Sequence, residues 1–134
     1  MKFNQAILSI ENVIKLKGFS AGYDNELAFV AIDEIKGIGY MNPTNHEQII
    51  LDGVILELEA FRGNLQIKYI ESTKKGRGNG TLVMKEIFEI VDRLVVDITL
   101  TAYEVGDTKK SQLLKWYKSL GFVDEKDYLI RHAQ

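Results

Sequence analysis

The sequence predicts an α/β (α+β) protein with a mixed, mostly antiparallel central sheet flanked by helices. Three observations support this fold class. Apolar segments in the first half alternate with polar residues and are separated by turn residues, which is typical of β-strands. A glycine-rich run with Gly76, Gly78 and Gly80 then joins a strand-like segment to one with helical periodicity. The second half alternates helix and strand, so we expect a single layered domain over residues 1–134.

The composition is that of one folded domain. The 134 residues are 46% apolar and 10% aromatic, enough to bury a sizeable core. With 17 basic and 19 acidic residues the net charge is −2, so we expect no direct binding of nucleic acid or of an anionic membrane. The absence of cysteine excludes disulfides and a cysteine nucleophile, and we expect no metal site. No apolar run could span a bilayer, so we expect a cytoplasmic protein.

The first half is predicted to be rich in strands. Residues 6–16 fit a short helix or a strand, and we favour a strand. Further strands are expected over 27–32, in a short segment ending near Met41, and over 48–60 with a hairpin turn at Asp52 and Gly53. A tight turn at 62–64 leads into a strand over 65–71, which has Leu65, Ile67 and Tyr69 on one side.

The second half is predicted to contain two helices and two strands. The first helix covers 80–94, and its apolar face carries Val83, Ile87, Ile90, Val91 and Leu94. A strand over 95–103 and a polar loop over 104–108 follow, with Asp107 or Thr108 as the N-cap of the next helix. That helix ends at Gly121, and its buried side comprises Leu113, Trp116 or Tyr117, and Leu120. Phe122 is expected to pack back onto it, and a last strand covers 128–131.

The glycine-rich turn predicts an anion-binding site. A strand that runs through such a turn into a helix presents unpaired backbone N–H groups at the positive end of the helix dipole. Lys75 and Arg77 add positive charge there. A Walker loop would need Lys-Ser or Lys-Thr after the glycines, and a dinucleotide fingerprint would need a wider second glycine spacing. An acyl-coenzyme A loop and a tight turn that binds nothing stay open.

Two motifs together resemble the GCN5-related N-acetyltransferase (GNAT) family. The first, Lys75-Gly76-Arg77-Gly78-Asn79-Gly80, is similar to the family's acyl-coenzyme A loop, Gln/Arg-x-x-Gly-x-Gly/Ala, with Lys in the first place. In the second, Tyr117 and Gly121-Phe122 match the family's helix that ends in Tyr-x-x-x-Gly-Phe. The resemblance covers residues 54–132. It implies a GNAT-like fold with a reduced, β-rich N-terminal half, in which the family's two usual helices are not evident.

The resemblance implies an acetyl-CoA-dependent N-acetyltransferase that transfers an acetyl group to a primary amine by direct attack in a ternary complex. The acceptor would be a protein lysine, a protein N-terminus or a small-molecule amine. The chain looks most similar to small phage or mobile-element acetyltransferases, some of which acetylate a lysine on a bacterial defence nuclease. The implied coenzyme-binding residues line the pantetheine arm and the pyrophosphate: Ile70, Glu71, Ser72, Lys75, Gly76, Arg77, Gly78, Asn79, Gly80 and Thr81.

The resemblance also implies catalytic residues. Tyr117 matches the motif tyrosine and would protonate the leaving thiolate, although a core tyrosine fits the same position. The carboxylates Glu57, Glu59 and Glu71 border the expected site, and we select Glu71 as the candidate base. Each of these carboxylates also fits a solvated strand position.

A non-catalytic alternative stays open: a GNAT-like module that binds acyl-CoA or a protein partner. Lys75 in place of Gln or Arg favours this alternative, as does Lys110 where the family often has Asn. The missing helices of the first half favour it too. The sequence does not distinguish a monomer from a homodimer.

Overall fold

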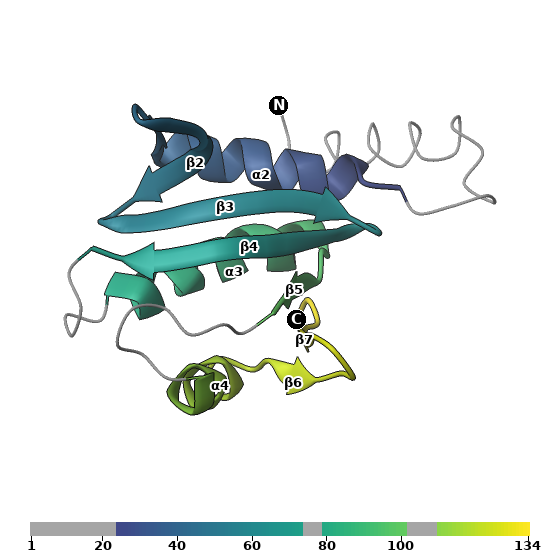
Figure 1. The fold of residues 1–134 in the computed structure, drawn as a ribbon. Coiled ribbons are helices and arrows are strands. Elements are labelled where there is room, and N and C mark those ends of the chain that lie inside the picture. Colours follow the sequence, from purple (N-terminus) through teal and green to yellow (C-terminus); the bar gives the residue numbers. More distant parts are fainter. Residues whose placement is uncertain (1–23, 74–78, 102–109) are drawn as a thin grey trace.

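The computed structural model describes residues 24–73, 79–101 and 110–134 (Figure 1). The strand expected over 6–16, the loop residues 75–78, and the N-cap expected at Asp107 or Thr108 lie outside the described residues. The described elements, in chain order, are α2 (Glu26–Ile38), β1 (Tyr40–Asn42), β2 (Asn45–Leu51), β3 (Val54–Phe61), β4 (Asn64–Ser72), α3 (Asn79–Leu94), β5 (Ile98–Leu100), α4 (Lys110–Ser119), β6 (Val123–Asp124) and β7 (Leu129–Arg131).

The described strands form one seven-stranded sheet in the order β1-β2-β3-β4-β5-β7-β6. Every neighbouring pair is antiparallel except β4 and β5, which are parallel. Helix α3 makes the crossover between these two parallel strands, as parallel pairing requires. Helices α2 and α3 contact each other and both pack on β3 and β4, so they cover the same face of the sheet (Figure 1). The predicted fold class is confirmed.

Helix α2 corrects the expectation for the first half. The strand expected over 27–32 is wrong, because this segment lies inside α2. The buried residues of α2 recur with helical spacing, at Ala28, Ala31, Ile32 and Ile35. A short, unbroken apolar run fits a buried strand and a buried helix equally well, and burial of this face against the sheet decides for the helix. The described part of the first half is therefore less β-rich than expected.

Both predicted hairpin turns are confirmed. Asp52 and Gly53 connect β2 to β3 with φ angles of 50° and 79°, and Arg62 and Gly63 connect β3 to β4 with φ angles of 52° and 80°. Two consecutive residues with positive φ are what two-residue hairpins of type I′ need, which is why glycine stands second in each turn. The backbone N–H of Gly63 donates to Oδ1 of Asn25 at 2.8 Å, which joins this turn to the start of α2.

Strand β4 contains a bulge at Lys68. Glu57 of β3 pairs with Tyr69, whereas the next residue, Leu58, pairs with Ile67, so Lys68 has no partner across this ladder. The bulge reverses the alternation of β4. Ile67 lies on the core side before it, but Tyr69 lies on the opposite side after it. The expectation that Tyr69 shares a side with Leu65 and Ile67 is wrong for this reason.

Helix α3 follows the sequence prediction closely. Its buried residues include all five predicted ones together with Met84 and Phe88. The next strand, expected over 95–103, begins later than expected, since β5 covers Ile98–Leu100. Residues 102 and 103 lie outside the described residues. Val95 lies in the left-handed region at φ 58°, where its N–H donates to the carbonyl of Asp92 and the N–H of Val96 donates to the carbonyl of Val91. This is a Schellman ending with valine at the position where glycine is preferred.

The C-terminal part places α4 beside α3. Gly121 has a φ of 98° and ends the helix, as predicted. Phe122 packs back onto Tyr117 with ring centroids 5.6 Å apart and also lies next to Phe88 of α3. Strand β6, which the sequence analysis did not predict, follows at once and pairs with β7, the predicted last strand.

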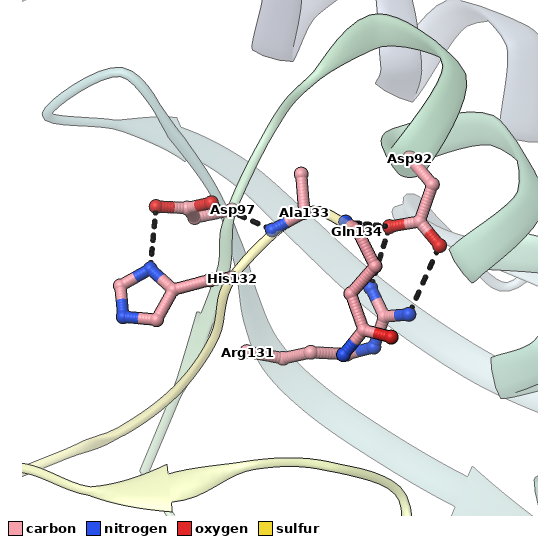
Figure 2. A network of polar contacts seen from close by, with 6 residues as sticks. All are labelled: Asp92, Asp97, Arg131, His132, Ala133 and Gln134. Atoms are coloured by element: carbon pink, nitrogen blue, oxygen red, sulfur yellow. Dashed lines mark hydrogen bonds and ion pairs between the residues drawn. The ribbon is translucent and has the colours of Figure 1, made fainter.

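A buried ion pair ties the chain end to α3 (Figure 2). The guanidinium of Arg131 makes two hydrogen bonds to the carboxylate of Asp92, at 2.8 and 3.0 Å, and lies 3.8 Å from the centre of the Phe88 ring. Hydrogen bonding to Arg131 holds the pKa of Asp92 below its ordinary range. The backbone N–H of Gln134 also donates to Asp92, and that of Ala133 to Asp97. Strand β7 is thereby fixed beside β5.

Candidate functional site

The parallel ladder between β4 and β5 ends beside a bulge in β4. Their parallel ladder joins Leu65 to Ile98, Gln66 to Thr99 and Ile67 to Leu100. The next residue of β4 is the bulged Lys68, and from there β4 continues to Ser72 along β3, while the described part of β5 ends at Leu100. A bulge bends the strand that contains it, and bulges are over-represented next to active sites. The carboxyl ends of two neighbouring parallel strands thus lie side by side here, and such ends are a common place for ligands in α/β sheets.

Both ends of the glycine-rich loop are fixed on one turn. On the β4 side, the backbone N–H and the hydroxyl of Thr73 donate to the carbonyl of Gly53, at 2.9 and 2.8 Å. On the α3 side, the side-chain amide of Asn79 donates to the carbonyl of Asp52 at 2.9 Å. The end of β4 and the start of α3 therefore lie close together beside the same hairpin. The first backbone N–H groups of α3 have no acceptor within the helix and form its positive end.

An indole from α4 packs on the first turn of α3. A Cβ atom on Gly80 would stand 3.3 Å from Cζ2 of Trp116, so glycine here leaves room for the indole ring. The indole N–H donates to the hydroxyl of Thr81 at 3.0 Å. Beyond the buried position considered for it in the sequence, Trp116 joins the two motif-bearing segments of the chain. Its partner Thr81 lies 35 positions away in sequence, and no local pattern signals this contact.

Tyr117 is a core residue by its surroundings. Its exposed fraction is 4%, and its ring lies 4.9 Å from that of Trp116 and 5.6 Å from that of Phe122, measured between centroids. Burial raises the pKa of Tyr117 to about 12, so the hydroxyl stays protonated at neutral pH. A protonated phenol in apolar surroundings fits a proton donor and also fits a packed core tyrosine.

Glu71 and Tyr69 form a hydrogen-bonded pair on β4. The Tyr69 hydroxyl donates to Oε2 of Glu71, and this hydrogen bond raises the pKa of Tyr69. Glu57 is the cross-strand partner of Tyr69 and accepts a hydrogen bond from the Gln48 amide at 3.0 Å. Two of the three candidate carboxylates therefore flank Tyr69. The third, Glu59, pairs with Gln66 further along the ladder. Tyr69 was not among the predicted site residues, because the bulge that brings it to this side leaves no signal in the alternation of polar and apolar residues.

Of the coenzyme-binding residues that the resemblance implies, Ile70, Glu71 and Ser72 lie at the end of β4. Asn79, Gly80 and Thr81 open α3, on the other side of the glycine-rich loop. Residues 75–78 lie outside the described residues. Within the described part of the chain, no three His, Asp or Glu side chains are placed to hold a metal ion. None of its helices is long and apolar enough to cross a membrane.

Comparison with solved structures finds a likeness in fold to the crystal structure of the anti-CRISPR protein AcrVA5. The two chains align with a TM-score of 0.53 and 20% sequence identity, over 62% of this chain and 94% of that one. Searches against protein-family profiles and against curated proteins give no match. The likeness supports the GNAT-like fold that the two sequence motifs imply. At 20% identity it concerns the fold and not the chemistry.

Proposed function

We propose that this protein is an N-acetyltransferase that uses acetyl-CoA and a primary amine. The observation that carries the proposal is the end of the β4–β5 ladder beside the bulged Lys68, at the end of the sheet from which the chain leads into α3. An extended chain with amide groups can add to a strand edge as though it were another strand, which suits the pantetheine arm. Phosphate groups bind favourably at a helix N-terminus, which suits the pyrophosphate. Both features belong to one end of the sheet.

The proposed binding roles follow the chain. Ile70, Glu71 and Ser72 of β4 would lie along the pantetheine arm. Backbone N–H groups at the start of α3 would face the pyrophosphate, and Lys75 and Arg77 would add positive charge. Bound acetyl-CoA supplies an activated thioester for attack by the amine. The residues of this complete set are Ile70, Glu71, Ser72, Lys75, Gly76, Arg77, Gly78, Asn79, Gly80 and Thr81.

The proposal also assigns two proton transfers, one to a carboxylate and one from a phenol. The carboxylate of Glu71 accepts the proton that the amine loses as its nitrogen bonds to the acyl carbon. The Tyr69 hydroxyl is hydrogen bonded to Oε2 of Glu71 and so positions this carboxylate. The hydroxyl of Tyr117 gives its proton to the sulfur as the carbon–sulfur bond breaks. A pKa of about 12 keeps Tyr117 protonated until that moment.

A second candidate function is a GNAT-like module that binds acyl-CoA or a protein partner without transferring a group. The burial of Tyr117 between Trp116 and Phe122 favours it, because a tyrosine packed only for stability would have the same surroundings. The two candidates differ in one measurable property, the production of free coenzyme thiol in the presence of an amine.

The deciding experiment measures release of coenzyme thiol from acetyl-CoA across a panel of primary amines. Tyr117→Phe should lower turnover about 100-fold if its hydroxyl is the proton donor. Tyr128→Phe is the matched control, because Tyr128 is an exposed tyrosine and should keep full turnover. Glu71→Gln should lower turnover as well and should shift the pH profile. Binding of acetyl-CoA without transfer to any amine would favour the second candidate.

A further inference from the structure

Strands β2 and β3 separate at the same level of the sheet as the bulge. Their ladder joins Leu51 to Val54, Ile50 to Ile55 and Ile49 to Leu56, and it stops there although both strands continue. A pocket of about 510 Å³ lies at this separation. Its apolar lining comes from Ile32 of α2, Met41 of β1, Ile49 of β2 and Leu58 of β3. A volume of this size is within the ordinary range of small-ligand sites, roughly 300 to 1,000 Å³.

Five charged side chains from four different elements line this pocket. They are Lys36 of α2, Glu47 of β2, Glu57 and Glu59 of β3, and Lys68 of β4. Within the described part of the chain, none of the five forms an ion pair. Opposite charges thus surround one pocket without neutralising each other. A ligand that carries both charges can meet both kinds of side chain at once.

A hydrogen bond crosses the separation between the strands. The side-chain amide of Gln48 donates to Oε1 of Glu57 at 3.0 Å, and the amide of Asn42 donates to Oε1 of Gln48 at 2.9 Å. Side chains therefore bridge β1, β2 and β3 where the β2–β3 backbone ladder has ended. Gln48 and Glu57 both line the pocket, so this chain of hydrogen bonds holds part of its wall in place.

We propose that this pocket binds a zwitterionic amine, that is, an amino acid or short peptide that carries an ammonium group and a carboxylate on an apolar stem. The stem would lie on Ile32, Ile49 and Leu58, with the ammonium near the glutamates and the carboxylate near the lysines. Lys68 belongs both to this pocket and to the bulge beside the end of the β4–β5 ladder. Only the further role of this ligand as the acetyl acceptor rests on the proposed function; the binding itself does not.

Isothermal titration with L-lysine as the probe tests the proposal. n-Butylamine keeps the side-chain ammonium and the stem but lacks the α-ammonium and the carboxylate, and hexanoate lacks both ammonium groups. L-lysine should bind about two- to fivefold more tightly than either analogue, since a partly exposed charge contact is worth up to about fivefold. Equal binding of the three probes, or no saturable binding of L-lysine, would overturn the proposal.

Two variants locate the binding. Glu59→Gln and Lys36→Gln each remove one charge from the pocket with little change of shape, and each should weaken L-lysine binding about fivefold. Lys85→Gln and Glu89→Gln on the exposed side of α3 are the matched controls and should bind L-lysine as the unchanged protein does. Unchanged L-lysine affinity in both pocket variants would refute this site.

Acetyl-CoA binding measured in the same variants separates the two proposals. It should be unaffected in Glu59→Gln and Lys36→Gln, because neither residue lies at the start of α3. Loss of L-lysine binding with acetyl-CoA binding intact supports the pocket and leaves the enzyme proposal standing. Failure of acetyl-CoA to bind, with L-lysine still bound, would contradict the enzyme proposal alone.

Discussion

The two ion pairs of the C-terminal region offer a test of how burial decides the strength of an interaction. Arg131 and Asp92 have a nitrogen–oxygen distance of 2.8 Å, and so do Lys118 and Asp124. The side chains of the first pair are 6% and 25% exposed, and those of the second are 53% and 56% exposed. We therefore compare Asp92→Asn with Asp124→Asn, which make the same chemical change at two depths.

Asp92→Asn should cost about 3 kcal/mol of the free energy of unfolding, the low end of the range for breaking a buried ion pair, because Asp92 is a quarter exposed. The change leaves the Arg131 guanidinium buried over the Phe88 ring without its counter-charge, and an amide oxygen cannot replace both carboxylate oxygens. Asp124→Asn should cost less than about 0.5 kcal/mol, because both partners are solvated.

Urea denaturation followed by circular dichroism measures both values, provided that the slope with urea is unchanged. The free energy of unfolding at acid pH provides a second measurement. Because the folded pKa of Asp92 lies below its ordinary value, its contribution is complete above that value and is lost as the pH falls through the folded pKa. Asp92→Asn should remove this part of the acid sensitivity. Equal losses in Asp92→Asn and Asp124→Asn would refute the reasoning from burial.

Three further predictions concern backbone geometry and titration. Gly39→Ala should destabilise the protein by about 2 kcal/mol, because the new Cβ would stand 2.6 Å from the carbonyl oxygen of Ile50. Gly37→Ala is the control: its Cβ meets nothing within 4 Å, so this variant should be as stable as the unchanged protein or more stable. Thermal melts of the two variants compare them. Val95→Gly should raise the free energy of unfolding by about 1 kcal/mol, since it removes a left-handed valine, and an unchanged urea midpoint would contradict this. Burial raises the pKa of Tyr117 to about 12, so the free energy of unfolding should fall by roughly 2 kcal/mol as the pH rises from the ordinary tyrosine value of 10.0 towards 12. Urea titrations at alkaline pH measure this loss, and Tyr117→Phe should lack it.

The sequence allowed those parts of the fold to be predicted that local chemistry decides. The turns at Asp52-Gly53 and at Arg62-Gly63 need consecutive residues with positive φ, and the glycine in each is typical of such turns. Helix α3 has a clear apolar stripe, and Gly121 marks the end of α4. Helix α2 could not be assigned, because an unbroken apolar run carries no period that separates helix from strand.

The parts of the site that depend on pairing between strands could not be predicted. The bulge at Lys68 exists only in relation to β3, and it decides on which side Tyr69 lies. The contact of Trp116 with Thr81 joins two distant segments, and the same is true of Arg131 with Asp92. Motif spacing indicated the loop and the tyrosine helix, but not the indole that packs between them.

The measurement that tests the central claim most directly is calorimetric titration of the folded protein with acetyl-CoA, compared with S-acetylpantetheine, which has the same arm without the phosphates. We expect saturable binding of acetyl-CoA to one site, at least about tenfold tighter than that of S-acetylpantetheine and weaker at high salt, because the phosphates would meet the positive end of α3. No saturable heat with acetyl-CoA, from protein whose circular dichroism shows it folded, would contradict the account.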